Sequence, residues 1–161
     1  MPGSDIDLLL LLPDNGHAGL DAALEQLLMF LWDIGLEVGH SVRTVEQCLE
    51  QAGADLTVTT TLLEARLLDG PEELFDAMQA AIAPDRIWPP DKFFEEKRKE
   101  QIERHHRYHD TAYNLEPNVK GSPGGLRDIQ MIGWVTKRHF GVGSFDELVA
   151  HDFLSPGQER R

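Results

Sequence analysis

Two aspartates placed directly before a run of leucines are the feature that most limits how this chain can fold. Ser4-Asp5-Ile6-Asp7 is followed by Leu8-Leu9-Leu10-Leu11-Leu12, and the turn sequence Pro13-Asp14-Asn15-Gly16 comes next. Polar-apolar alternation that becomes a continuous apolar run predicts a strand over residues 5–12 that enters a core. Residues two apart on a strand face the same side, about 7 Å apart along the chain, so Asp5 and Asp7 project together.

A carboxylate pair of this kind is suited to hold one or two Mg²⁺ ions. In phosphoryl chemistry two such ions stabilise the attacking and the leaving oxygen. A plain Asp-x-Asp is common, however, and two solvated aspartates at the entrance of a strand are the other interpretation. The leucine run favours the metal site, because it buries the strand and leaves the two aspartates at the exposed start of that strand.

A third carboxylate would complete such a site, and two candidates stand in the sequence. Glu37 lies in Leu36-Glu37-Val38, at the start of a second predicted strand, and alternation puts Gly39 on its face. Asp55 is the rival, although it is equally placed to cap a helix. Glu37 is the preferred third ligand.

Hydrophobic spacing and capping residues predict an α/β first part and a helical second part. The first part is predicted to contain a helix over 20–34 that ends at Gly35, and then a strand over 36–43. A helix is predicted to start at Thr44, with Gln47 completing a capping box. A mostly helical segment over 55–68, ended by Gly70, and a helix that begins at Pro71 are predicted to follow. After Trp88-Pro89-Pro90, the predicted boundary, helices are expected over 91–108 and 126–140, a loop over 114–125, and a short helix capped by Ser144 and Glu147.

The glycine-rich loop before residue 126 is a candidate anion site. Lys120 precedes the expected helix and Arg127 lies in its first turn. Backbone N–H groups at a helix start favour anions, and the two cations add charge. A simple turn, in which Asp128 interacts favourably with the helix dipole, is the alternative.

The histidines suggest a different chemistry. His105, His109 and Asp110 are reminiscent of the metal ligands of a phosphohydrolase. The neighbouring Arg104 and Arg107 instead favour a solvated helix face, and this is the preferred interpretation.

Composition excludes several classes of partner. The net charge of −13 disfavours nonspecific binding to nucleic acid, whose phosphates would be repelled. The longest apolar run, Leu8 to Leu12, is far too short to span a membrane. The single cysteine, Cys48, fits a reducing compartment, so a cytoplasmic location is expected.

Six stretches in this order resemble the protein-PII uridylyltransferases. They are residues 4–11, 36–44, 55–60, 88–94, 107–118 and 122–129. The resemblance runs from Ser4 nearly to the C-terminus, and the combination is specific although each stretch alone is not.

The resemblance implies a polymerase-β-like nucleotidyltransferase core over residues 1–88 and an all-α helical domain over 89–161. It implies transfer of UMP from UTP to a tyrosine of the signalling protein PII, with Mg²⁺ or Mn²⁺ as the cofactor. By this analogy Asp5 and Asp7 are metal ligands. Glu37, preferred over Asp55, is the expected third ligand, and Ser4, Lys120 and Arg127 are expected to contact the nucleotide. Neither nucleic acid nor a membrane is an expected partner.

The resemblance also has a departure. Proteins of this fold carry a Gly-Ser or Gly-Gly segment shortly before the Asp-x-Asp strand, and only three residues precede Ser4. The chain is therefore expected to be a fragment, truncated at both ends, with weak activity of its own and without the hydrolase domain that removes UMP. A binding remnant without chemistry, and a relative that adenylylates glutamine synthetase, are the alternatives.

Overall fold

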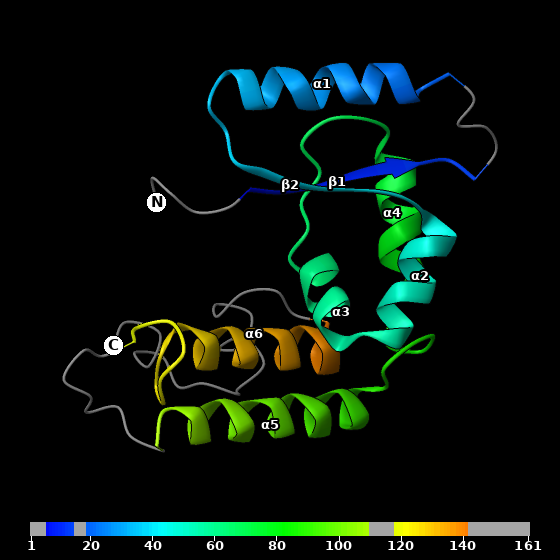
Figure 1. Cartoon of the computed structure of the whole chain (residues 1–161). Coiled ribbons are helices and arrows are strands. Elements are labelled where there is room, and N and C mark those ends of the chain that lie inside the picture. Colours follow the sequence, from blue (N-terminus) through cyan, green and yellow to red (C-terminus); the bar gives the residue numbers. More distant parts are fainter. Residues whose placement is uncertain (1–5, 15–18, 110–117, 142–161) are drawn as a thin grey trace, which may run out of the picture. The chain divides into compact units, whose positions relative to one another are not determined.

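The protein consists of two compact units, residues 1–83 and 84–161 (Figure 1). The computed structural model describes residues 6–14, 19–109 and 118–141. Within these residues it has one two-stranded sheet and six helices, so the chain is a mixed α/β protein, as predicted. The identity of the two predicted domains, with their boundary at residue 88, stays a prediction.

Unit 1 begins with a strand–helix–strand arrangement. Its elements are β1 (Ile6–Leu12), α1 (Asp21–Asp33), β2 (Val38–Thr44), α2 (Val45–Ala54), α3 (Leu56–Leu63) and α4 (Glu72–Ala81). The strands run parallel, with Asp7 opposite Gly39 and Leu12 opposite Thr44. Parallel neighbours need a crossover connection, and α1 supplies it.

The leucines of β1 are only half-buried, and none is fully enclosed. The expectation of a strand that enters a core is therefore met in part. A sheet of two strands leaves each strand on an edge, so neither face can be covered as it is in a larger sheet. On α1 only Leu28 of the predicted apolar face is buried, and Leu20 and Leu27 are exposed.

The core of unit 1 lies where α2 packs against α3 and α4. Its buried hydrophobic residues are Cys48, Ala52, Leu62, Leu63, Met78, Ala81 and Ile82. The predicted capping box at the start of α2 is confirmed: the Thr44 hydroxyl accepts the Gln47 N–H at 3.2 Å, and the Gln47 side chain accepts the Thr44 N–H at 2.9 Å.

The segment after α3 differs from the prediction. α3 ends at Leu63, although the sequence predicts helix as far as residue 68. Gly70 has a φ of +115°, which suits a turn between helices, and Pro71 is the N-cap of α4 rather than its first residue.

Unit 2 is a pair of packed helices, α5 (Pro90–Arg107) and α6 (Leu126–Phe140). Both lie within one residue of the predicted bounds. Phe93, Met131 and Trp134 form the buried apolar contact between them, together with the stem of Lys97. The Lys97 ammonium pairs with Glu100 at 2.7 Å and lies 4.6 Å from the centre of the Trp134 ring. The predicted short helix capped by Ser144 lies outside the described residues.

Arg138 ties α6 to the segment that precedes α5. Its guanidinium donates to the carbonyl oxygen of Trp88 at 2.9 Å and also to that of Ile87. The side chain is 2% exposed, and burial lowers the pKa of the guanidinium. This anchor explains how Trp88 is held at a φ of +45°, a conformation that costs energy in a non-glycine residue.

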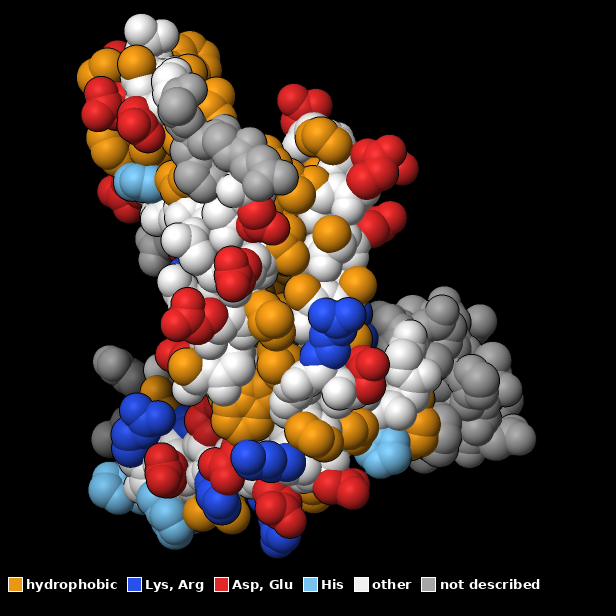
Figure 2. All heavy atoms as spheres, turned by 90° about the vertical axis from the view of Figure 1, so that its right-hand side faces the viewer, with side chains coloured by type: hydrophobic (Ala, Val, Ile, Leu, Met, Phe, Trp, Pro, Cys, Tyr) orange, Lys and Arg blue, Asp and Glu red, His pale blue; other side chains and the backbone are white. Residues whose placement is uncertain are grey.

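Charge is divided unequally between the units. Unit 1 contains two of the 15 Lys and Arg residues and 15 of the 28 Asp and Glu residues, so it carries the whole net charge of −13. Unit 2 is formally neutral. Figure 2 shows most of the Lys, Arg and His side chains of one face gathered over α5 and α6. None of the described helices has the length and apolar character needed to cross a membrane.

Candidate functional site

Asp7 and Glu37 line one pocket of unit 1. Asp7 is the second residue of β1, and Glu37 immediately precedes β2. The pocket has a volume of about 690 Å³, and the other residues that line it are Trp32, Gly35, Leu36, Val38 and Gly39. Asp7 pairs with Gly39 in the sheet, and Glu37 lies two residues before Gly39. The period of a strand therefore places both carboxylates on the same face.

Gly39 leaves the space in which the Asp7 side chain lies. A Cβ atom at this position would be 2.9 Å from the Asp7 carboxylate oxygen Oδ1. The space that Gly39 leaves beside Glu37 is therefore partly filled by the Asp7 carboxylate. A side chain at position 39 would push Asp7 away from its strand partner.

Of the remaining residues predicted for this site, Asp55 is among those that the structure describes. Asp5 and Ser4 lie outside the described residues. Asp55 caps α3, where its carboxylate accepts the Thr57 N–H at 2.7 Å. This is the capping role that the sequence left open for it.

The described residues include no group of three or more His, Cys, Asp or Glu side chains arranged to hold a metal ion. Two carboxylates nevertheless fit the needs of Mg²⁺. This ion keeps several waters and is usually held by one or two carboxylates together with substrate phosphates.

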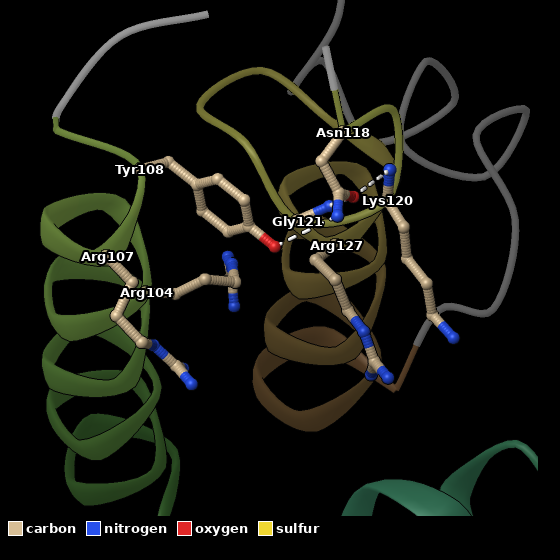
Figure 3. Close-up of a pocket in the computed structure, with 7 residues that line it drawn as sticks. All are labelled: Arg104, Arg107, Tyr108, Asn118, Lys120, Gly121 and Arg127. Atoms are coloured by element: carbon tan, nitrogen blue, oxygen red, sulfur yellow. Dashed lines mark hydrogen bonds between the residues drawn. The ribbon is translucent and has the colours of Figure 1, made fainter. Parts of the chain in front are cut away.

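A second pocket, in unit 2, is lined by cations. Its volume is about 250 Å³, and the residues that line it are Arg104, Arg107, Tyr108, Asn118, Lys120, Gly121 and Arg127. Figure 3 shows that Arg104 and Arg107 reach it from α5, Lys120 from the loop and Arg127 from the first turn of α6. The structure thus brings the two predicted anion-binding residues together. We call this the cation pocket.

The loop of the cation pocket is organised by Asn118. Its side-chain oxygen accepts the N–H groups of Lys120 at 3.1 Å and Gly121 at 2.8 Å. Its amide nitrogen donates to the Tyr108 hydroxyl at 3.0 Å. A Cβ atom at position 121 would be 2.8 Å from that hydroxyl, so glycine is needed for the ring to lie against the loop.

The backbone donors at the start of α6 are already used. The N–H groups of Leu126 and Arg127 donate to the carbonyl oxygens of Val119 and Lys120, at 2.9 and 3.0 Å. The prediction that these backbone donors hold an anion is therefore wrong. Any anion held here depends on side chains.

Asp128 is the centre of a dense hydrogen-bond network. Its carboxylate accepts from Arg104 at 2.6 Å, from the Gly124 N–H at 2.7 Å and from Gln101 at 2.9 Å. The His105 ring nitrogen Nε2 lies 2.9 Å from the same carboxylate. Burial alone would raise the pKa of the Asp128 carboxyl, but these hydrogen bonds outweigh it and lower the pKa to about 2.

The network changes the interpretation of the charged helix. Arg104 is not on a solvated face, because its side chain is only 12% exposed and is paired with Asp128. Its Nε atom is buried without a hydrogen-bond partner among the described atoms. His105 also faces Asp128. Sequence reasoning missed the roles of Arg104 and Arg107, although their spacing of three residues, which places them on one face of a helix, was a usable signal.

Comparisons with known proteins agree with one another. The family model described as GlnD PII-uridylyltransferase matches residues 92–161. A bifunctional uridylyltransferase/uridylyl-removing enzyme of Nitrosococcus oceani is 57% identical over 99% of this chain and 18% of its own length. Enzymes of the same name match at 55% identity in Pseudomonas entomophila (95% of this chain, 17% of the relative) and at 49% in Vibrio campbellii (99% and 18%).

These matches define the class of protein as that of the uridylyltransferases. The chain belongs to the family of bifunctional uridylyltransferase/uridylyl-removing enzymes. It spans less than a fifth of the length of the curated relatives that it matches. No solved structure matches it.

Proposed function

We propose that this chain forms part of the nucleotidyl-transfer site of a uridylyltransferase, on a core related to that of polymerase β. The reaction is transfer of UMP from UTP to a tyrosine of the protein PII. The tyrosine oxygen bonds to the α-phosphorus of UTP, the bond from that phosphorus to the pyrophosphate oxygen breaks, and the phenolic proton leaves to solvent. The observation that carries the proposal is the presence of Asp7 and Glu37 at one pocket.

Asp7 and Glu37, together with Asp5, would hold Mg²⁺ or Mn²⁺. Ser4 would lie close to the nucleotide. The ion, when bound, supplies positive charge against the phosphate oxygens of UTP. The chain itself contributes two carboxylates at one pocket, because Asp7 stands on β1, Glu37 directly precedes the partner strand β2, and Gly39 leaves room for Asp7. Catalysis of phosphoryl-type transfer by a protein depends mostly on positioning of this kind.

Metal binding can be measured on the chain by calorimetry with Mn²⁺ or Mg²⁺. Asp7→Asn together with Glu37→Gln should remove the binding, because amides lack the charge of carboxylates. Glu50→Gln, at an exposed position of α2, is the matched control and should change nothing. Equal metal affinity in the double variant and the control would contradict the metal site.

Transfer is best measured in a graft, because the chain covers only part of its relatives. The matching stretch of the Nitrosococcus oceani enzyme would be replaced by this chain, and labelling of PII from radiolabelled UTP would be followed. Glu37→Gln should lower the rate on the order of 100-fold, the loss that about 1 Å of misalignment can cause. Glu50→Gln should leave it unchanged.

The graft also separates the alternatives. Labelling from ATP on glutamine synthetase, with none from UTP on PII, would replace the proposal by adenylyl transfer. Binding of UTP without transfer to either protein would indicate a binding module without chemistry.

A further inference from the structure

We infer that the cation pocket is a binding site for a diphosphate group, built by residues of unit 2. The sequence predicts only Lys120 and Arg127 as charged groups of this site, together with backbone donors. The structure adds Arg104, Arg107 and Tyr108 and shows the donors to be side chains.

The first support is charge. Four cationic side chains line the pocket, and only Arg104 is paired, with Asp128 at 2.6 Å and Glu100 at 3.9 Å. Among the described residues no carboxylate lies within salt-bridge distance of Arg107, Lys120 or Arg127. Like charges held close together repel each other, and a bound polyanion would relieve that repulsion.

The second support is the geometry of the donors. Guanidinium groups match phosphate oxygens bidentately, and three of the four cations are arginines. The Tyr108 hydroxyl accepts its hydrogen bond from Asn118, which leaves its own proton available to donate. Figure 3 shows this hydroxyl close to Asn118, with Arg104 and Arg107 on one helix and Arg127 on the other.

The third support is rigidity. Arg104 is fixed by Asp128, and the same carboxylate holds the Gly124 N–H of the loop. Asn118 fixes the backbone of Lys120 and Gly121. Lining residues that are held in place before a ligand arrives spend less entropy on binding it.

Size selects the kind of anion. The volume of about 250 Å³ is below the roughly 300–1,000 Å³ of pockets that enclose drug-sized molecules. A whole nucleotide would not be enclosed, whereas a short phosphate chain would. Three cations without a salt-bridge partner among the described residues also favour an anion of several charges over a singly charged carboxylate.

Two sources of a diphosphate are chemically possible: free pyrophosphate and the terminal phosphates of a nucleoside triphosphate. The choice of UTP as the nucleoside triphosphate rests on the proposed function. The inference that the pocket binds a diphosphate group does not rest on it.

The test is calorimetric titration of the chain with pyrophosphate, UTP and UMP in EDTA, so that no metal-dependent binding at Asp7 and Glu37 contributes. We expect pyrophosphate to bind at millimolar concentrations or below. Arg127→Ala and Lys120→Ala should each weaken it by about tenfold or more, because each removes a charge-assisted hydrogen bond. Arg98→Ala is the matched control: Arg98 is exposed on α5, half of the helical circumference away from Arg107.

The outcomes are distinct. UTP binding with the same dependence on Arg127, and no UMP binding, would identify the nucleotide tail as a ligand; pyrophosphate binding without UTP binding would identify free pyrophosphate. No pyrophosphate binding, or equal weakening by Arg98→Ala and Arg127→Ala, would overturn the inference. Lys120→Ala changes an exposed loop residue, so its result stands even if Arg127→Ala fails to fold. Binding without transfer in the graft would contradict only the proposed function, and transfer without binding only this inference.

Discussion

Asp128 links the stability of unit 2 to pH. Its side chain is 15% exposed, and it accepts hydrogen bonds from Gln101 and Arg104 of α5 and from Gly124 of the loop. A carboxyl with a lowered pKa stabilises the folded state fully above its unfolded pKa, near 3.8, and the contribution is lost as pH falls through the folded value of about 2.

We therefore expect the free energy of unfolding to fall by about 2 kcal/mol between pH 5 and pH 2 on account of this residue, since one pKa unit corresponds to about 1.4 kcal/mol. Asp128→Asn should remove this part of the pH dependence. Urea unfolding followed by tryptophan fluorescence measures it, because Trp134 is buried between α5 and α6. Asp91→Asn, at a residue whose side chain is 97% exposed, is the control. An unchanged pH dependence in Asp128→Asn would contradict the role of the network.

Gly125, at the start of α6, and Gly121, in the cation pocket, should respond differently to the same substitution. A Cβ atom at Gly125 would be 2.7 Å from the Val119 carbonyl oxygen and 2.8 Å from that of Ser122, both backbone atoms that cannot move alone. Gly125→Ala should therefore destabilise the loop by about 1–3 kcal/mol, the usual cost of overpacking.

At Gly121 the obstacle is the Tyr108 side chain, which can swing aside. Gly121→Ala should lower the melting temperature less than Gly125→Ala does, while weakening pyrophosphate binding because the hydroxyl moves. Equal losses of stability in the two variants would show that the Tyr108 ring is as fixed as the backbone.

At the scale of elements, the start of α3 decides the role of Asp55. Asp55→Ala should cost about 1 kcal/mol of stability, whereas Asp55→Asn should cost little, because asparagine caps as well as aspartate does. In the graft, Asp55→Asn should also leave transfer unchanged while Glu37→Gln lowers it. Loss of transfer in Asp55→Asn at full stability would make Asp55, not Glu37, the third metal ligand.

Elements whose signals are local could be predicted from the sequence. α6 was predicted at its observed bounds, because Gly125 and Gly141 punctuate a strongly periodic segment. The α2 capping box depends only on Thr44 and Gln47. The end of α3 was missed, since threonines in this segment favour strand and the later leucines favour helix, so tertiary contacts decide where the helix stops.

The candidate site was predictable in part for the same reason. Strand alternation predicted Asp5 and Asp7 on one face of the first strand and Glu37 and Gly39 on one face of the second. Only the pairing of Asp7 with Gly39 relates Asp7 to Glu37. The partners of Arg104 were not predictable, because Asp128 and Arg104 are 24 residues apart and meet only when α5 packs on α6. Without that contact, a helix rich in Arg and His looks solvated.

At the scale of the whole molecule, the two units differ in net charge. Unit 1 carries all of the net charge of −13, which favours a divalent cation at Asp7 and Glu37. Unit 2 is formally neutral and concentrates four cations at one pocket. The chain therefore combines an acidic surface with one basic site, instead of the broad basic face that nucleic-acid binding proteins display.

This division predicts how binding depends on salt and on the kind of phosphate offered. Pyrophosphate binding should weaken several-fold between about 0.05 and 0.5 M NaCl, because the Debye length falls from roughly 14 Å toward 4 Å over that range and screens the exposed Arg107 and Lys120. Duplex DNA should not bind even at the lower salt concentration. Its phosphates extend far beyond a pocket of about 250 Å³ and would be repelled by the excess charge of the chain. Fluorescence anisotropy of a labelled duplex and calorimetry with pyrophosphate, in the same buffers, measure both. DNA binding that disappears in Arg127→Ala would mean that the cation pocket recognises a nucleic-acid backbone, and pyrophosphate would then be only a partial mimic of its ligand.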